Sequence, residues 1–100
     1  MIDWGAISGF DCDQGNQSKN FEAHGVTQPE AEEVFLNAPI VSEDLKHSSV
    51  ESRWHALGET NSGKKLHVTF TLRNKGTKIR IISARDMSRK ERQTYEKTDS

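Results

Sequence analysis

Apolar and polar residues alternate over residues 65–73, and this period of two predicts a β-strand with one buried and one open face. The apolar positions are Leu66, Val68, Phe70 and Leu72. The polar positions are His67, Thr69, Thr71 and Arg73. One packed face and one polar face are typical of an antiparallel sheet that helices cover on one side only.

Two further strands are predicted on either side of this one. Residues 51–58 alternate, with Trp54 and Ala56 on one face and Arg53, His55 and Leu57 on the other. Residues 78–84 contain β-branched isoleucines and predict a buried strand. Turns at residues 61–63 and 74–76 connect the three strands as a meander. Residues 10–13 and 40–42 are candidates for short additional strands.

Three helices are predicted from their end signals. The first spans residues 14–24, with Asp13 as its N-cap and Gly25 after its last turn. The second starts at a capping box of Thr27 and Glu30 and runs to about residue 37. A second capping box, Ser88 and Glu91, starts the last helix.

The predicted fold class is therefore α+β, with two N-terminal helices, an antiparallel sheet of three to four strands and a C-terminal helix. Residues 1–100 form one domain, in which residues 1–9 are a loosely ordered lead-in. The open sheet face is expected to present two arginines, two histidines and two threonines, but no acid. They are Arg53, His55, His67, Thr69, Thr71 and Arg73.

Composition narrows the class of protein. A single cysteine, Cys12, excludes an internal disulfide and a cysteine-based zinc site, and it fits a reducing, cytoplasmic setting. Asp11 and Asp13 beside Cys12 disfavour a reactive thiolate, so we expect a packed side chain there. No apolar run approaches the ~20 residues of a membrane span, and the N-terminus lacks the features of a signal peptide.

Charge is divided unevenly along the chain. Residues 1–50 contain two Lys or Arg and nine Asp or Glu, whereas residues 51–100 contain twelve and six, so the halves carry −7 and +6. Such asymmetry favours a surface that binds a polyanion. The alternative is that the two halves interleave in space and their fields cancel.

The residue types on the open face suit RNA cleavage through the 2′-hydroxyl, which needs a base, an acid and cations around the phosphorus. Candidate catalytic residues are Arg53, Arg73, Arg85 and His55. Candidate RNA-binding residues are Arg80, Arg89, Arg92 and Lys65. The alternative is a solvated face with arginines paired to Glu51 or Glu59. The general base stays open between a histidine, water and a carboxylate such as Glu51.

Arg85 needs a counter-charge because it ends a strand beside the positive end of a helix, and that charge is either a carboxylate or an outside anion. No metal site is predicted, since the four histidines lack ligand spacing. A phosphate-binding loop and a cofactor site are also not predicted.

The chain resembles the BrnT-type toxins, small ribonucleases of bacterial type II toxin–antitoxin pairs. The pieces that carry the resemblance are FDCDQGNQSKN at 10–20, HGVTQPEAEEVF at 24–35, KHSSVESRWHALGET at 46–60, HVTFTLR at 67–73 and IRIISARDMSRKERQTYE at 79–96. The resemblance implies a RelE/ParE-like fold and metal-free RNA cleavage that inhibits translation. It also implies neutralisation by a BrnA-like antitoxin, with promoter DNA bound only through the antitoxin complex, and functional roles for Arg53, Arg73 and Arg85.

Three features depart from the family pattern. Cys12 stands where the family usually has tryptophan, and Ala23, next to Glu22, stands where it usually has lysine; the leading nine residues are also longer than usual. A cation lost from the first helix weakens contact with RNA. The alternative function is thus a catalytically weak or inactive protein of the toxin fold that acts as a protein-interaction module.

Overall fold

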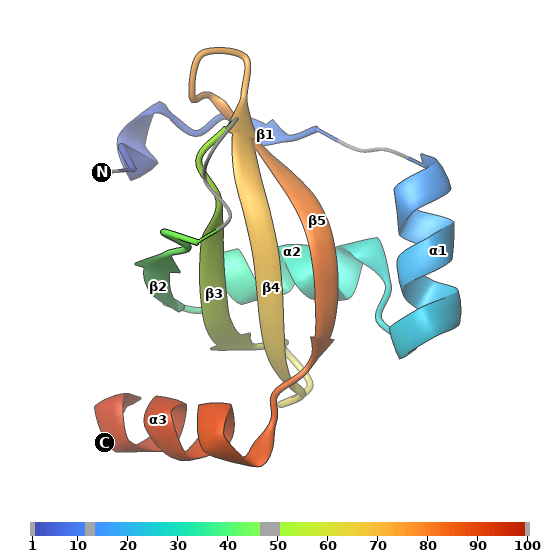
Figure 1. Ribbon diagram of the computed structural model, residues 1–100, viewed down its shortest axis with the longest axis vertical. Helices are drawn as coiled ribbons and strands as arrows, with labels where there is room; N and C mark the ends of the chain where they lie inside the picture. Colours follow the sequence, from blue (N-terminus) through green and yellow to red (C-terminus); the bar gives the residue numbers. More distant parts are fainter. Residues whose placement is uncertain (1, 12–13, 47–50, 100) are drawn as a thin grey trace.

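The computed structural model describes residues 2–11, 14–46 and 51–99, which form a five-stranded sheet with helices on one side and at its edges (Figure 1). The elements, in chain order, are the 3-10 helix η1 (Trp4–Ala6), β1 (Gly9–Phe10), α1 (Gln14–His24), α2 (Gln28–Leu36), β2 (Ile40–Glu43), β3 (Trp54–Glu59), β4 (Lys65–Arg73), β5 (Lys78–Asp86) and α3 (Arg89–Asp99). The predictions for Cys12, Asp13 and the loop at residues 47–50 lie outside the described residues.

The α+β class is confirmed, but the sheet is larger than predicted and is mixed. The strand order is β1-β5-β4-β3-β2. The four strands from β2 to β5 form the expected antiparallel meander. The fifth, β1, pairs in parallel with β5, so that Phe10 lies opposite Ile79. Two residues carry no recognisable parallel-strand pattern, because such pairing depends on a long crossover and not on local alternation.

Helix ends follow the predicted capping signals. Gly25 ends α1 in the left-handed region, with φ of 69°, and its N–H donates to the Phe21 carbonyl at 2.7 Å. The box at α2 is closed by Thr27 N–H to Glu30 Oε1 at 2.9 Å and Glu30 N–H to Thr27 Oγ1 at 3.3 Å. Asn37 caps the end of α2, close to the predicted boundary. These bonds satisfy backbone groups that helix formation leaves unpaired.

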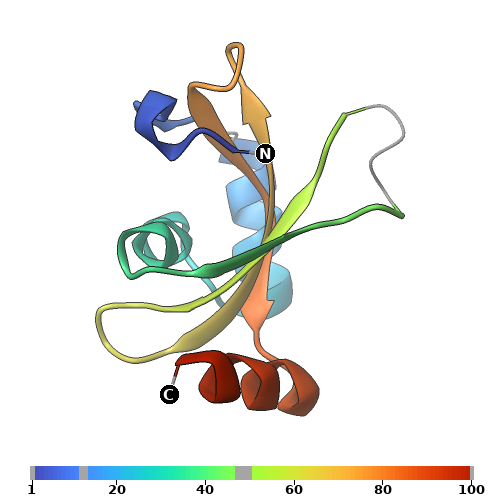
Figure 2. The same ribbon diagram turned by 90° about the vertical axis from the view of Figure 1, so that its left-hand side faces the viewer.

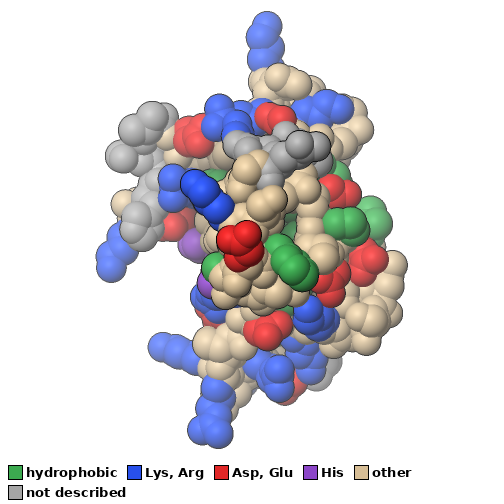
Figure 3. Space-filling model, turned by 90° about the vertical axis from the view of Figure 1, so that its right-hand side faces the viewer, with side chains coloured by type: hydrophobic (Ala, Val, Ile, Leu, Met, Phe, Trp, Pro, Cys, Tyr) green, Lys and Arg blue, Asp and Glu red, His purple; other side chains and the backbone are tan. Residues whose placement is uncertain are grey.

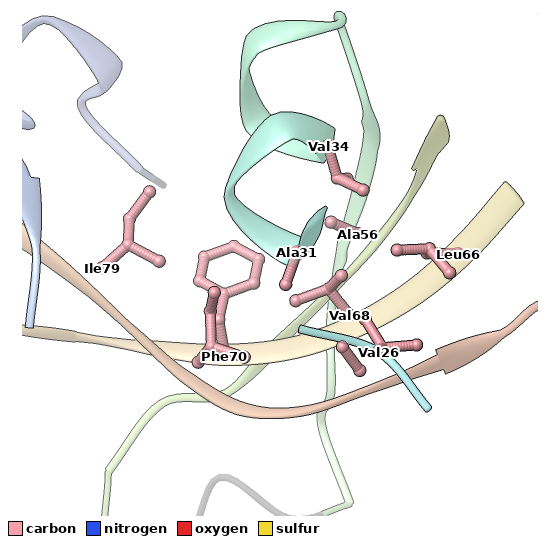
Figure 4. Close-up of a cluster of buried hydrophobic side chains, with 10 residues drawn as sticks. Val26, Ala31, Val34, Ala56, Leu66, Val68, Phe70 and Ile79 are labelled. Carbon is pink, nitrogen blue, oxygen red and sulfur yellow. The ribbon is translucent and has the colours of Figure 1, made fainter. Parts of the chain in front are cut away.

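The hydrophobic core lies between α2 and the inner sheet face, and Figure 2 shows α2 on one side of the sheet with α3 beyond the end of the strands. Its largest fully buried side chains are Phe70, Leu66, Ile79, Val26, Val34 and Val68 (Figure 4). Phe70 is central: its ring centroid lies 4.9 Å from that of Phe35, in edge contact, and 5.9 Å from that of Trp54. The predicted apolar faces of 65–73 and 51–58 therefore pack against α2, which contributes Ala31, Val34 and Phe35.

The N-terminal segment forms a short turn that contacts the core. Asp3 accepts a hydrogen bond from Gly5 N–H at 3.1 Å and so starts the η1 turn. Trp4 packs on the core, with ring centroids 6.4 Å from both Phe35 and Phe70. These aromatic contacts join residues that are distant in sequence.

Thr71 is the exception on the open face. It is only 2% exposed, and its hydroxyl donates to the Ser52 carbonyl at 2.7 Å. The backbone that leads into β3 therefore covers this position.

Among the described residues, no helix is long and apolar enough to cross a membrane.

Gly58 marks the closest approach of β3 to α2 and provides a test of the packing. An added Cβ would lie 2.8 Å from Val34 Cγ1 and 3.3 Å from Pro39 Cβ. We expect Gly58→Ala to lower the free energy of unfolding by about 1–3 kcal/mol through overpacking. Urea denaturation followed by circular dichroism measures this change. Gly5→Ala, at an exposed position, is the control, and equal stability of both variants contradicts the predicted packing.

Candidate active site

The strand register places the polar side chains of the open face in rows across the sheet. One row consists of Leu57, His67 and Arg85, and the next consists of His55, Thr69 and Ser83. Helix α3 lies beyond the end of the strands, next to the row that contains His67. A cavity of about 260 Å³ opens between the sheet and α3, lined by Ser42, His55, Leu57, His67, Lys90, Glu91 and Thr94.

A β-bulge on β5 brings two arginines to the open face. Thr69 pairs with Ser83 while Phe70 pairs with Ile81, so Ile82 is an extra residue in the ladder. Strict alternation would point Arg80 and Arg85 to opposite faces, because five positions separate them. The extra residue reverses the phase between them, so both share the face that presents His67.

Arg85 and Glu91 form the strongest interaction of the site. Arg85 Nη1 and Nη2 donate to the two Glu91 carboxylate oxygens at 2.8 Å each. Glu91 Oε1 also accepts from Ser88 N–H at 2.9 Å, which completes the predicted capping box of α3. The guanidinium, followed by this backbone N–H, lowers the pKa of Glu91 to about 2, and the same bonds raise the pKa of Arg85.

His67 lies beside this pair, with its side chain 11% exposed and its Nε2 atom 3.8 Å from Glu91 Oε2. Within the described part of the chain, its buried Nδ1 atom has no hydrogen-bond partner. Burial lowers the pKa of His67, and the positive charge of Arg85 lowers it further, against a smaller opposing effect of Glu91. His67 is therefore a neutral imidazole near pH 7, which is a proton acceptor.

His55 is held from both sides of its ring. Its Nε2 atom lies 3.0 Å from Asp44 Oδ2, and its Nδ1 atom lies 3.0 Å from Thr69 Oγ1. The ring centroids of His55 and His67 are 4.7 Å apart. A carboxylate on one ring nitrogen fixes the orientation of the imidazole.

The four predicted catalytic residues are not gathered in one compact site. Arg85 and His55 lie in the rows at the cavity, and Arg53 directly precedes β3, two positions from His55. Arg73 lies six residues from His67 along β4, which corresponds to about 20 Å. Its Nη2 atom is 3.5 Å from Glu51 Oε1. The alternative of an arginine paired with Glu51 therefore holds for Arg73.

The predicted RNA-binding residues surround the cavity at different distances. Arg80 lies on the open face opposite Thr71, and Lys65 Nζ is 2.8 Å from Glu96 Oε2 on α3. Arg89 and Arg92 are exposed on α3. In the view of Figure 3, histidine side chains lie at one edge of the molecule with Lys and Arg side chains above and below them.

The expectation that the open face lacks acids is wrong. Asp44, after β2, and Glu91, on α3, reach it from neighbouring elements and pair with His55 and Arg85. Sequence reasoning did anticipate a carboxylate as one of two possible counter-charges for Arg85, and that expectation is confirmed. It did not assign His67 to the site, although alternation placed this residue on the open face next to the strand that holds His55.

Residues 2–11, 14–46 and 51–99 contain no group of three or more His, Cys, Asp or Glu side chains arranged to hold a metal ion.

The fold is shared with a protein of known structure. It superposes on the 1.1 Å crystal structure of the Brucella abortus ribonuclease toxin, BrnT, with a TM-score of 0.65, 24% sequence identity, and coverage of 83% of this chain and 100% of the other. At this identity the match shows the shared fold. No curated protein is significantly similar to the chain.

The sequence comparison is more specific. The family described as "Ribonuclease toxin, BrnT, of type II toxin-antitoxin system" matches residues 12–91. The chain therefore belongs to the BrnT family of type II toxin–antitoxin ribonuclease toxins. Membership implies an antitoxin partner and confirms the resemblance noted in the sequence.

The low pKa of Glu91 predicts a specific acid sensitivity. Its folded-state pKa of about 2 lies below the ordinary value of 4.5, so its contribution to stability is complete above pH 4.5 and is lost as the pH falls towards 2. We expect Glu91→Gln to lower the free energy of unfolding by about 1–2 kcal/mol at pH 7, because the pair is partly exposed.

The difference between wild type and Glu91→Gln should shrink as the pH falls through this window. Urea denaturation at a series of pH values measures it. Glu22→Gln, on the exposed surface of α1, is the control and should stay within about 0.5 kcal/mol of wild type. A gap between wild type and Glu91→Gln that is constant with pH contradicts the assignment.

Proposed function

We propose that this chain is an endoribonuclease that cleaves RNA without a metal ion, at the cavity between the open sheet face and α3. The observation that carries the proposal is the placement of His67 beside Arg85, a proton acceptor next to a guanidinium. These two groups supply what attack by a 2′-hydroxyl on phosphorus needs most, a base and a fixed positive charge.

In the proposed reaction His67 takes the proton of the 2′-hydroxyl, and the oxygen then attacks the adjacent phosphorus. Arg85 stabilises the negative charge that gathers on the phosphoryl oxygens. The bond from phosphorus to the 5′-oxygen breaks, leaving a cyclic phosphate. The leaving oxygen receives a proton from His55, whose ring is oriented by Asp44 at 3.0 Å. The step is balanced, because one proton is taken and one is returned.

The remaining predicted arginines are proposed to bind the RNA around this centre. Arg53 and Arg80 lie on the same face beyond His55, and Arg73 lies about 20 Å from His67. Such a strip follows the phosphate chain of a single strand. Lys65, Arg89 and Arg92 are proposed to contact phosphates on the other side of the cavity. No cofactor takes part.

Family membership supports further proposals about where the chain acts and which partners it binds. We propose that the chain acts in the cytoplasm, where cleavage of RNA inhibits translation, and that a BrnA-like antitoxin neutralises it. Promoter DNA is bound only through the complex, with the antitoxin as the DNA-binding part. The antitoxin is proposed to cover the basic face or the acidic helix α2, which carries Glu30, Glu32 and Glu33.

A second candidate function is a catalytically weak or inactive toxin that serves as a protein-interaction module. The observation that favours it is that carboxylates already pair with several site cations. Glu91 forms an ion pair with Arg85, Glu96 forms one with Lys65, and Glu51 lies near Arg73.

The first prediction from the proposed function concerns cleavage by the purified chain in the presence of a chelator. We expect wild type to cleave single-stranded RNA, and His67→Gln and Arg85→Ala to lower the rate at least about 100-fold. Arg73→Ala should have a smaller effect, below about tenfold, because it removes only a distant phosphate contact. Gel analysis of labelled RNA measures the rates.

His24→Gln makes the same substitution at an exposed position of α1 and should leave the rate unchanged. Thermal unfolding by circular dichroism shows whether each variant is folded. Full activity of His67→Gln would remove this residue as the base. Cleavage that disappears with chelator and returns with a metal ion would disprove the metal-free mechanism.

The second prediction concerns the antitoxin. Because charge is unevenly divided along the chain, binding of a BrnA-like antitoxin should weaken at least about tenfold between about 50 mM and 0.5 M salt. Isothermal titration calorimetry measures the dissociation constant at each salt concentration. An affinity that does not change with salt would show that apolar contacts, and not charge, dominate the interface.

A further inference from the structure

Glu91 stands where an anionic substrate would have to bind. We infer that its carboxylate occupies the phosphate subsite of the open face, so that an RNA phosphate must displace Glu91 before Arg85 can act on it. This inference rests on the proposed function and adds to it an internal competitor. It concerns a phosphodiester of single-stranded RNA.

The guanidinium of Arg85 is hydrogen-bonded along one edge. Both terminal nitrogens donate to Glu91 at 2.8 Å, and Nη1 also donates to the Asp86 carbonyl at 3.0 Å. A guanidinium binds a carboxylate and a phosphate through the same parallel pair of N–H groups. The edge of Arg85 that would bind a phosphate is therefore occupied.

The surroundings of the Glu91 carboxylate are those of an anion site. Arg85 faces it from β5, His67 Nε2 lies 3.8 Å away on β4, and Ser88 N–H donates to it at 2.9 Å. Lys90 and Thr94, on the same helix, line the adjoining cavity. The cavity is open and large enough to admit a phosphate group beside the carboxylate.

Helix α3 has few buried side chains, which permits the Glu91 carboxylate to move away from Arg85. Of the side chains described for this helix, only Tyr95 is buried. Figure 1 shows α3 beyond the end of the strands, apart from the packed helix α2. The other contacts of its polar face to the sheet include the exposed pair of Lys65 and Glu96. Rotation of the Glu91 side chain, or a small shift of α3, therefore leaves the main core intact.

Two matched variants test the inference. Glutamine at N3 still completes a capping box, so Glu91→Gln removes the competing charge and keeps the helix start. Glu30→Gln makes the same change at N3 of α2, where Glu30 caps Thr27 and pairs with Lys64 at 3.2 Å. Both variants gain one unit of positive charge, and only the first changes the proposed subsite.

The probe is a single-stranded DNA oligonucleotide of about ten nucleotides, which has phosphates but no 2′-hydroxyl and so cannot be cleaved by the proposed route. We expect Glu91→Gln to bind it about five- to tenfold more tightly than Glu30→Gln at low salt, measured by fluorescence anisotropy. Equal or weaker binding by Glu91→Gln overturns the inference.

Failure of this inference is distinguishable from failure of the proposed function. Tighter binding by Glu91→Gln with no RNA cleavage by any variant supports the masked subsite and rejects the ribonuclease. Chelator-resistant cleavage by wild type without a gain in affinity supports the ribonuclease and rejects the masking role.

A measurement on wild type guards against a variant that fails to fold. Saturation with the same oligonucleotide should move the ¹³C signal of the Glu91 carboxyl carbon as its bonds to Arg85 are lost. The Glu30 carboxyl signal is the internal control and should stay in place. A Glu91 signal that does not move at saturation overturns the inference.

Discussion

The bidentate ion pair between Arg85 and Glu91 joins the sheet to helix α3 at the candidate site. Its two 2.8 Å bonds connect the end of β5 to the first turn of α3, and the same carboxylate caps that helix. Helix α3 in turn forms one wall of the cavity that His67 lines. Burial lowers the pKa of His67 and the charge of Arg85 lowers it further, so the proton acceptor lies next to the same ion pair that attaches the helix.

The bulge at Ile82 is the second requirement, because it decides which arginines face His67. Without the extra residue, Arg80 and Arg85 would lie on opposite sides of β5, and one of them would point into the core. A bulge is a local exception to strand alternation and cannot be inferred from a run of isoleucines. The arginines therefore share a face with His67 only because of this bulge, which the alternation of apolar and polar residues does not reveal.

Local signals in the sequence predicted local structure well. Both capping boxes, the turn at Gly25 and the alternation of 65–73 were sufficient to place the helices and the central strands. Contacts between distant segments were not predictable in this way. The parallel pairing of β1, the packing of Trp4 and the approach of Asp44 to His55 depend on how the elements are assembled. The carboxylate of Asp44 beside His55 was missed for that reason.

The acids of the open face form a graded set of contacts. Glu96 and Glu51 have side chains 53% and 38% exposed, and each forms one ion pair within the described part of the chain, whereas Glu91 is 25% exposed and forms several contacts there. Exposed single pairs contribute little stability and exchange readily with other anions. A phosphate chain presents many charges at once, so we expect it to replace the weak pairs first and the Arg85 pair last. Release of Arg85 would then depend on contacts elsewhere along the strand, which favours a long RNA over a mononucleotide or an isolated phosphate ion.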